Sequence, residues 1–318
     1  MQDKGLIMKR ERICAVVVTF NRKTLLEECL TALLNQTKPL DEIIVIDNAS
    51  TDGTDGLMKT KFAGITYVKL GENIGGSGGF YEGIKLAYEK GHDWIWVMDD
   101  DAIPMPDALE KLTDCPLLTD DKVYALASAV IDHAGSIFLA HRRLFDPRTL
   151  EERVIAVDKY EQEYFQMDTA SFVGFLISHK AINDVGLPLK DIFIYYDDTE
   201  YSLRMRENGI MLTVPSSKII HGDPGKGPDK SPWGQPLSGW KRYYATRNRI
   251  YIYKKYGRPG TSLYINLLRV IWLNIREALL FRSSKFQNIR ITLRGTMDGL
   301  RGKLGKNTRF IPNQPTSS

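Results

Sequence analysis

The stretch DWIWVMDDDAIPMP, residues 93–106, decides the fold that this sequence predicts. Its apolar part, residues 94–98, runs directly into three consecutive aspartates, Asp99, Asp100 and Asp101. Two prolines follow, and a proline cannot continue the regular hydrogen bonding of a central strand. The stretch therefore predicts a buried strand that ends at the rim of a sheet and delivers carboxylates into a cleft.

Strand geometry divides the three aspartates between two sides. Successive side chains of an extended segment point to opposite faces, so Asp99 and Asp101 share one side and Asp100 points to the other. Two carboxylates on one side repel each other unless a cation lies between them, and Mg²⁺ or Mn²⁺ suits such hard oxygen ligands. The alternative is a solvated acidic turn, or a cap for a helix that begins near Pro106.

The chain before this stretch alternates between expected strands and helices. Continuous apolar runs predict strands buried on both faces at residues 13–20, 42–46 and 65–70. Such alternation is typical of an open α/β sheet, in which ligands bind outside the carboxyl ends of the strands. Four polar loops fall at those ends: residues 19–22, 47–52, 73–79 and 99–101.

The glycine-rich segment ENIGGSGGF, residues 72–80, permits two interpretations. Its glycines allow the backbone to approach a phosphate closely, or they form a tight turn that supports the metal-binding loop. A nicotinamide-binding fingerprint, by contrast, follows the first strand of the sheet and reads G-x-G-x-x-G. Here the first strand is followed by TFNR, residues 19–22, which has no glycine and so disfavours a dinucleotide oxidoreductase.

The later part of the chain predicts a mixed or antiparallel section of the sheet, folded over the site. Short strands are expected at residues 124–131, 136–140, 154–158, 171–178 and 217–220, and an aromatic-rich strand at residues 192–196. The aromatic strand would end at Asp197 and Asp198, which act either as helix caps or as a general base. His221 follows the last strand, where it is a structural residue or completes a carboxylate metal site.

Composition and charge limit the cellular context. Three cysteines among 318 residues, without metal-ligand spacing, are typical of a reducing compartment. The first 12 residues contain no apolar signal core, and no stretch is long and apolar enough to span a membrane, so we expect a cytoplasmic protein. Residues 1–240 carry 26 basic and 37 acidic side chains, whereas residues 241–318 carry 17 basic and two acidic ones.

This basic segment indicates an interaction with an anionic surface. Residues 240–256 interleave aromatic and cationic side chains, and residues 263–281 are apolar except along one helical face, with Asn266, Arg269, Arg276 and Glu277. Such a helix suits the interface of an anionic membrane. The alternatives are packing on the rest of the chain or on a second subunit of a homo-oligomer. No nucleic acid partner is expected, because no recognition motif accompanies the charge.

Taken together, these motifs resemble the family 2 glycosyltransferases, which are inverting, metal-dependent nucleotide-sugar enzymes of the GT-A fold. VVVTFNR (16–22), IDNASTDGT (46–54), MDDD (98–101) and YYDDTEYSLR (195–204) match the motifs of that family in their order. With the glycine-rich segment, they look most like the galactofuranosyltransferase and rhamnosyltransferase branch.

The resemblance implies a fold and a division of the chain. Residues 12–225 would form the catalytic domain, an α/β structure with a mostly parallel sheet flanked by helices. Residues 226–239, rich in glycine and proline, would form a lid over the donor or an ordinary surface loop. Residues 240–310 would form a basic helical extension.

The resemblance also implies residue roles. Asp99, Asp101 and His221 would bind Mn²⁺ or Mg²⁺, and Asp198, the second member of the acidic pair, would be the general base. The residues implied for binding of the nucleotide-sugar donor are Thr19, Asn21, Arg22, Asp47, Asn73, Gly76 and Asp100.

The sequence thus predicts an enzyme that transfers a sugar to a lipid-linked or polysaccharide acceptor at the inner face of the cell membrane. Galactofuranose from UDP-galactofuranose is the first candidate, and rhamnose from dTDP-rhamnose is the alternative. A catalytically silent subunit that binds a nucleotide sugar and tethers a partner to the membrane is another class. Such a subunit has no need of a general base, so the complete set of acidic residues favours an enzyme.

Overall fold

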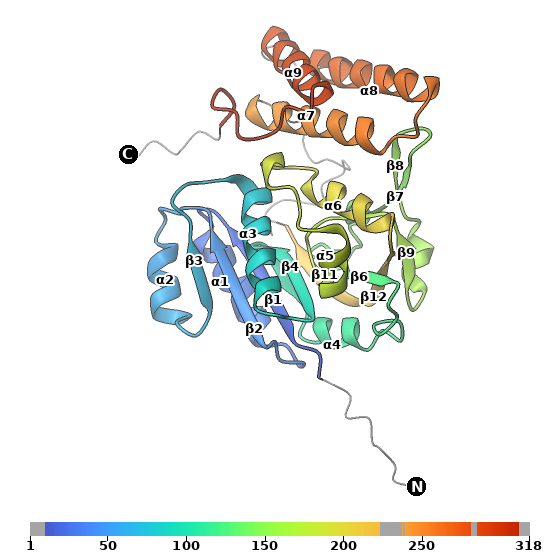
Figure 1. The fold of residues 1–318 in the computed structure, drawn as a ribbon. Coiled ribbons are helices and arrows are strands. Elements are labelled where there is room, and N and C mark those ends of the chain that lie inside the picture. Colours follow the sequence, from blue (N-terminus) through green and yellow to red (C-terminus); the bar gives the residue numbers. More distant parts are fainter. Residues whose placement is uncertain (1–9, 223–236, 238, 281–284, 312–318) are drawn as a thin grey trace.

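A computed structural model describes residues 10–222, 237, 239–280 and 285–311. These residues form an α/β body with a large sheet between helices, and the C-terminal helices lie across one end of it (Figure 1). The predicted lid at residues 226–239 lies outside the described residues, apart from residues 237 and 239.

The elements follow one another as the alternating pattern predicts. The strands are β1 (Ile13–Thr19), β2 (Glu42–Asp47), β3 (Thr66–Lys69), β4 (Trp94–Asp99), β5 (Ala102–Pro104), β6 (Val123–Ile131), β7 (Arg142–Asp146), β8 (Glu151–Val154), β9 (Phe165–Met167), β10 (Thr169–Ala170), β11 (Phe175–Ser178) and β12 (Ile210–His221). The helices are α1 (Lys23–Leu34), α2 (Thr54–Lys61), α3 (Gly75–Glu89), α4 (Ala108–Thr113), α5 (His179–Val185), α6 (Asp197–Arg206), α7 (Gly239–Tyr256), α8 (Thr261–Leu280) and α9 (Lys285–Leu300). The 3₁₀ turns are η1 (Leu139–His141), η2 (Val157–Glu161) and η3 (Lys190–Ile192).

The large sheet has a parallel half and a mixed half. Its order is β3-β2-β1-β4-β11-β6-β12-β5, and β9 also pairs with β12. Strands β3, β2, β1 and β4 are parallel to one another, whereas β11 is antiparallel to both β4 and β6. A small separate sheet, β10-β7-β8, lies beside α6 and α7. The predicted α/β class, with a parallel first half and a mixed second half, is confirmed.

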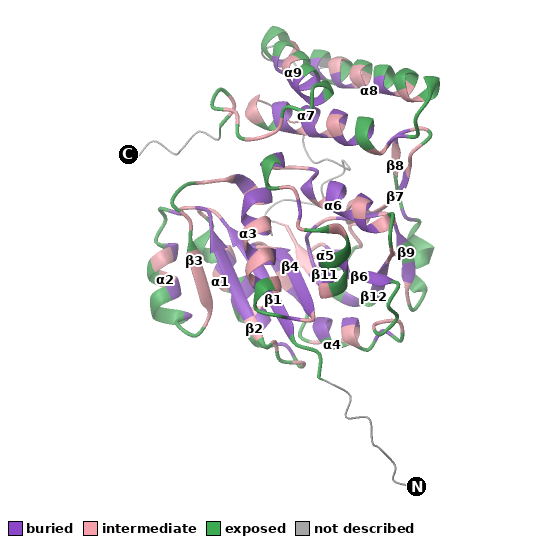
Figure 2. Ribbon diagram, in the orientation of Figure 1, coloured by how far each residue is buried: buried purple, intermediate pink, exposed green. Residues whose placement is uncertain are grey.

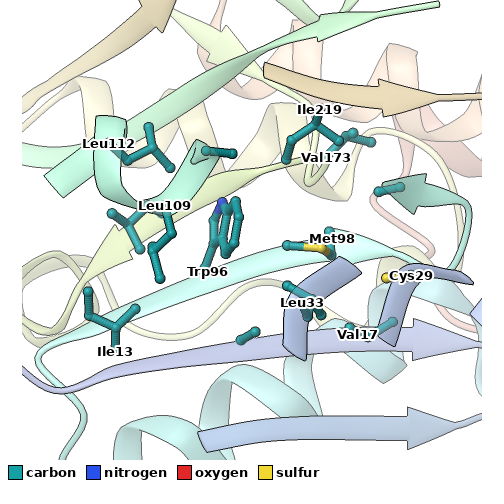
Figure 3. Close-up of a cluster of buried hydrophobic side chains, with 14 of the residues drawn as sticks. Ile13, Val17, Cys29, Leu33, Trp96, Met98, Leu109, Leu112, Val173 and Ile219 are labelled. Carbon is teal, nitrogen blue, oxygen red and sulfur yellow. The ribbon is translucent and has the colours of Figure 1, made fainter. Parts of the chain in front are cut away.

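Strand β1 is buried on both faces, as its continuous apolar sequence predicts. Alternate residues enter two different clusters, with Ile13, Ala15 and Val17 in one and Cys14 and Val16 in the other. Figure 3 shows the first cluster, in which the fully buried Trp96 of β4 lies near Leu109 and Leu112 of α4. This packing fixes the position of β4 within the sheet, and therefore the place at which the carboxylates that follow the strand lie.

Several predicted strands are wrong in detail. Residues 192–196 are not a strand but the last residue of η3 and the loop that leads to α6, because Phe193, Tyr195 and Tyr196 adopt positive φ angles. The expected strand at residues 171–178 begins only at Phe175, since Gly174 has a φ of 68°. Residues 136–140 form a single bridge and the turn η1, and residues 154–158 lie largely beyond the end of β8.

The glycine-rich segment is not a tight turn, as one of the two interpretations had it, but the first half of helix α3. Its glycines allow the helix to lie directly on β1. A Cβ atom on Gly79 would lie 2.5 Å from Val18 Cγ1, and one on Gly83 would lie 2.4 Å from Val16 Cγ1. Glycine is unfavourable inside a helix, so here close packing outweighs helix propensity.

Helices α7, α8 and α9 occupy the C-terminal part of the chain, where the sequence predicts a basic helical extension. Helix α7 packs on the body and is buried along much of its length, whereas α8 and α9 cover its outer side (Figure 2). No helix in the described part of the chain combines the length and the apolar character needed to cross a membrane.

The close contact between α3 and β1 predicts that Gly83→Ala destabilises the protein. The added methyl group meets the fully buried Val16, so we expect a loss of about 1–3 kcal/mol in the free energy of unfolding. Gly56→Ala in α2 is the matched control, because a Cβ there meets nothing within 4 Å and alanine should stabilise that helix by about 1 kcal/mol. Urea titrations of both variants test this. Equal stability of the two would contradict the packing account.

Candidate active site

A cavity of about 600 Å³ opens at the carboxyl ends of β1 and β4, between α3, α6 and the first turn of α7. The predicted site residues that line it are Thr19, Arg22, Asn73, Gly76, Asp99, Asp100, Asp101, Asp198 and His221. The sheet thus gathers residues separated by some two hundred positions, as expected for ligands bound at the carboxyl edge of an α/β sheet.

Asp99, Asp101 and His221 form a group of three metal-ligand side chains. Strand β4 ends at Asp99, and the chain then pairs with β12 as the edge strand β5, in a register that places His221 opposite Ala102. His221 Nε2 lies 3.1 Å from Asp101 Oδ1 and 4.0 Å from Asp99 Oδ2. One ligand atom from each side chain lies within 4.8 Å of the others.

The charges of this group suit a divalent cation. Partial burial of Asp99, whose side chain is 44% exposed, and repulsion from Asp101 raise the pKa of its carboxyl to about 7. Burial also opposes ionisation of Asp101, but the contact with His221 outweighs it and lowers the pKa of that carboxyl to about 2. Two carboxylate oxygens and an imidazole are ligands that Mn²⁺ and Mg²⁺ accept, so the residues present fit the expected metal.

Asp100 has other partners than Asp99 and Asp101, although all three line the cavity and residues 100–101 form a turn beyond the end of β4. It is 3% exposed and accepts a hydrogen bond of 2.7 Å from Thr19 Oγ1. Arg22 Nη1 lies 3.2 Å from Asp100 Oδ1 and 2.8 Å from Asp101 Oδ2, so one half-exposed guanidinium contacts both carboxylates. Burial raises the pKa of Asp100 to about 6, although Arg22 and Thr19 oppose the shift.

Two predicted donor-binding residues, Asp47 and Asn21, do not line the cavity. Asp47 is fully buried and accepts hydrogen bonds from Tyr67 Oη at 2.6 Å and from Ser50 N at 2.8 Å. Asn21 has a φ of 54°, and its Oδ1 accepts a bond of 2.8 Å from Thr51 N. Both side chains therefore hold the loops behind the cavity wall, and their contact with a donor stays a prediction.

The start of α3 forms another wall of the cavity. Asn73 and Gly76 line it, and a Cβ on Gly76 would meet nothing within 4 Å. Asn48, which the sequence analysis did not single out, also lines the cavity and donates from Nδ2 to Gly75 O at 3.2 Å. Gly75 N and Ser77 N already donate to Asn73 Oδ1 and Phe193 O, so this wall suits a phosphate group mainly through the positive end of the helix dipole.

The acidic pair Asp197 and Asp198 occupies the first turn of α6, and both side chains line the cavity. Burial and the repulsion between them raise the pKa of Asp197 to about 8, and burial also raises the pKa of Asp198. The prediction named only Asp198. Asp197 has the same access, and its pKa is also raised by the charge of Asp99. The spacing of residues along the chain contains no signal that separates the two.

The C-terminal segment also contributes to this cavity, which no pattern in the sequence indicated. Trp240 and Lys241 of α7 line it, next to Ile194 and Tyr195 of the loop that precedes α6. An aromatic ring with a nearby cation could have been recognised as a binding surface, but its position relative to the sheet depends on contacts that no local pattern shows.

Comparison with known proteins agrees with this geometry. The model of the family described as "Glycosyl transferase family 2" matches residues 14–186, more than half of the chain. The chain belongs to the family 2 glycosyltransferases. The expected resemblance and the expected class of enzyme are thereby confirmed.

The similar proteins of known name include members of both expected branches. Galactofuranosyltransferase GlfT1 of Mycobacterium tuberculosis is 30% identical over 93% of this chain and 98% of its own length. The GlfT1 of Mycolicibacterium smegmatis is 28% identical over 94% of this chain and 98% of its own length. The dTDP-rhamnosyl transferase RfbF of Shigella flexneri is 27% identical over 92% of this chain and 97% of its own length.

Solved structures show the GT-A fold. The mannosyltransferase PcManGT of Pyrobaculum calidifontis, determined with GDP-Man and Mn²⁺, superposes with a TM-score of 0.55 at 16% identity, over 93% of this chain and 89% of its own. GalNAc-T7, determined with UDP, GalNAc and Mn²⁺, gives a TM-score of 0.57 at 13% identity, over 92% of this chain and 56% of its own. The predicted GT-A fold is confirmed.

Proposed function

We propose that this glycosyltransferase is metal-dependent and inverting, and that it transfers galactofuranose from UDP-galactofuranose to a lipid-linked or polysaccharide acceptor. The observation that carries the proposal is the shared cavity, into which the group Asp99, Asp101 and His221 and the acidic pair both open. The two GlfT1 relatives, matched over nearly their whole length, support the choice of donor. RfbF supports dTDP-rhamnose as the second candidate.

The residues of the chain divide the chemistry between the two sides of the cavity. When bound at Asp99, Asp101 and His221, Mn²⁺ or Mg²⁺ supplies a Lewis acid that neutralises a nucleoside diphosphate. Arg22 adds a positive charge next to it, and the N-terminus of α3 adds the positive end of the helix dipole. On the donor side we also assign Thr19, Asn73, Gly76 and Asp100 to the nucleotide sugar, all of which line the cavity.

The acidic pair activates the acceptor. Asp198 accepts the proton of the attacking hydroxyl group, and its raised pKa makes the carboxylate a stronger base. The hydroxyl oxygen forms a bond to the anomeric carbon as the bond to the nucleoside diphosphate breaks. A single displacement of this kind inverts the anomeric centre and needs no nucleophile from the enzyme.

The first test compares donors and removes the metal. Purified enzyme with Mn²⁺ should hydrolyse or transfer UDP-galactofuranose faster than dTDP-rhamnose, and chelation by EDTA should abolish turnover. Asp101→Ala should lose the Mn²⁺-dependent part of UDP binding in calorimetry, because it removes one carboxylate ligand. Asp107→Ala is the control, because this half-exposed aspartate does not line the cavity. Equal UDP affinity with and without Mn²⁺ in wild type and Asp101→Ala would refute the metal site.

The second test identifies the base. Asp198→Asn should lower the rate of transfer by about 10²–10⁴-fold while UDP binding is nearly unchanged. A base must be ionised, so kcat/KM of the wild type should rise as pH increases through the apparent pKa of the pair. Asp197→Asn keeps Asp198 and should retain activity, and because Asp197, with a pKa of about 8, is still protonated while Asp198 ionises, the acid limb of its profile should stay in place. An inactive Asp197→Asn beside an active Asp198→Asn would reverse the assignment.

The outer face of α8 and α9 supports a peripheral membrane association. Its exposed apolar side chains are Tyr264, Ile265, Leu268 and Trp272 on α8, and Phe286, Leu293 and Met297 on α9. Beside them, Arg290, Arg294 and Arg309 line a groove of about 560 Å³. The polar residues Asn266 and Arg269 instead bond to the body, at Arg148 O, Thr149 O and Glu151. We assign this face to the anionic inner surface of the cell membrane, where apolar and cationic groups bind together.

Vesicle binding tests this assignment in the full-length chain. The wild type should float with phosphatidylglycerol vesicles and not with phosphatidylcholine, and the double variant Leu268→Glu, Trp272→Glu should stay in the soluble fraction. Leu34→Glu on α1, an equally exposed leucine far from this face, is the control. Unchanged flotation of the double variant would end the proposal. A wild-type dimer that the double variant dissociates, with no vesicle binding, would show instead that the face joins two copies.

A further inference from the structure

The loop that leads into the acidic pair has an unfavourable backbone conformation. Phe193, with φ 71° and ψ −58°, is the centre of a γ-turn in which Ile194 N donates to Ile192 O at 2.9 Å. Tyr195 and Tyr196 follow with φ angles of 64° and 70°. Three aromatic residues with positive φ are costly, and such a loop persists only when its surroundings hold it. Asp197 begins α6 directly after it.

The carbonyl groups of this loop are bound by one asparagine of α7. Asn248 is fully buried, and its Nδ2 lies 3.2 Å from Ile192 O, 2.8 Å from Ile194 O and 2.9 Å from Tyr195 O. Three carbonyl groups within four residues can reach one amide group only if the backbone turns as it does here. Without the amide, three carbonyl oxygens would lie close together without these N–H donors, which is unfavourable.

Arg247 fixes the asparagine and reinforces the turn. Its Nε donates to Asn248 Oδ1 at 2.8 Å, which orients the amide so that its NH₂ group faces the loop. Its Nη2 donates to Ile192 O at 2.7 Å and its Nη1 to Gly305 O at 2.6 Å. The guanidinium, fully buried, lies 4.8 Å from the ring centroid of Tyr244. The two adjacent side chains form one rigid unit, which we call the α7 clamp.

The opposite side of the loop contacts the start of α3, which we call the donor wall because we assign it to the nucleotide sugar. Phe193 O accepts a bond of 3.2 Å from Ser77 N in the first turn of α3. A Cβ on Gly75 would lie only 2.0 Å from that oxygen, so glycine is required there. The loop is thus held between the helix that lines the donor side and the helix that carries the clamp.

A second contact ties α6 to α7 one turn beyond the acidic pair. The fully buried Glu200 accepts from Lys255 Nζ at 2.9 Å and from Tyr256 Oη at 2.8 Å, both on α7. Arg204 of α6 completes the pairing at 2.9 Å. The direction of α6 is therefore also set by α7.

We propose that Asn248 and Arg247 are positioning residues for the reaction, and that the C-terminal helices complete the catalytic centre through them. The clamp holds residues 192–196 in the turn that aims Asp197 and Asp198 into the cavity. This inference rests on the proposed function, since it takes the acidic pair to contain the general base. The clamp contacts neither the donor wall nor the metal-ligand side chains, so its loss should act on the chemical step and not on donor binding.

Asn248→Asp tests the proposal, because it keeps the shape of the side chain and replaces its N–H donors by an oxygen that repels the three carbonyls. We expect kcat to fall on the order of 10²-fold, as for a small misplacement of a reacting group, with unchanged UDP affinity in Mn²⁺. The pH–rate profile should shift as well, because the surroundings of the acidic pair change. The control is Asn274→Asp in α8, whose Oδ1 accepts from Arg249 at 3.4 Å and whose side chain has no bond to the loop.

The outcomes separate this inference from the proposed function. Turnover is measured with UDP-galactofuranose or dTDP-rhamnose, whichever the wild type consumes, and folding is checked by thermal unfolding. If Asn248→Asp does not fold, Arg247→Lys is measured in its place, since lysine keeps the charge but loses the forked contact. The positioning role of Asn248 and Arg247 would be refuted by a normal kcat with an unchanged pH profile. It would also be refuted by a parallel loss of kcat and UDP affinity. If both Asp197→Asn and Asp198→Asn remain active, it is the proposed base that fails.

Discussion

Repulsion between carboxylates gathered at one edge of the sheet is the constraint on which the site depends. Asp99, Asp100, Asp101 and the pair Asp197 and Asp198 surround one cavity, and burial raises the pKa of four of the five. Within the described residues, Arg22 and His221 are the cations paired with the first three. A buried cluster of like charges is unfavourable by itself, and this is the physical reason for our proposal that a divalent cation and an acceptor hydroxyl bind at this edge.

The same edge shows why the C-terminal helices cannot be treated as a detachable anchor. Their outer face is apolar and basic, whereas α7 holds the loop before the acidic pair through buried polar contacts. A chain that ends at residue 239 would lose the clamp, Trp240 and Lys241 together. Its failure to transfer a sugar or to bind vesicles would therefore have several possible causes. Point substitutions on α8 leave the inner contacts in place and separate the two roles.

Much of the fold could be predicted because it follows from short periodic patterns. Continuous apolar runs identified β1, β2 and β4 as strands buried on both faces, and alternation assigned Asp99 and Asp101 to one side. The loop at residues 192–196 could not be predicted in this way, because its β-forming aromatic residues take positive φ angles only under contacts from Asn248, far along the chain. The first turns of α3, which lie in the glycine-rich segment, were missed for a similar reason, since its glycines allow close packing on Val16 and Val18 and are unfavourable for a helix.

The central claim is a single displacement assisted by one acidic pair, and the stereochemistry of the product tests it most directly. NMR spectra of the first product formed from a donor of known anomeric configuration report whether the new glycosidic bond has the opposite configuration. Our account predicts complete inversion, because the acceptor attacks from the face opposite the leaving diphosphate. Retention of configuration would require a covalent or front-face route and would contradict it.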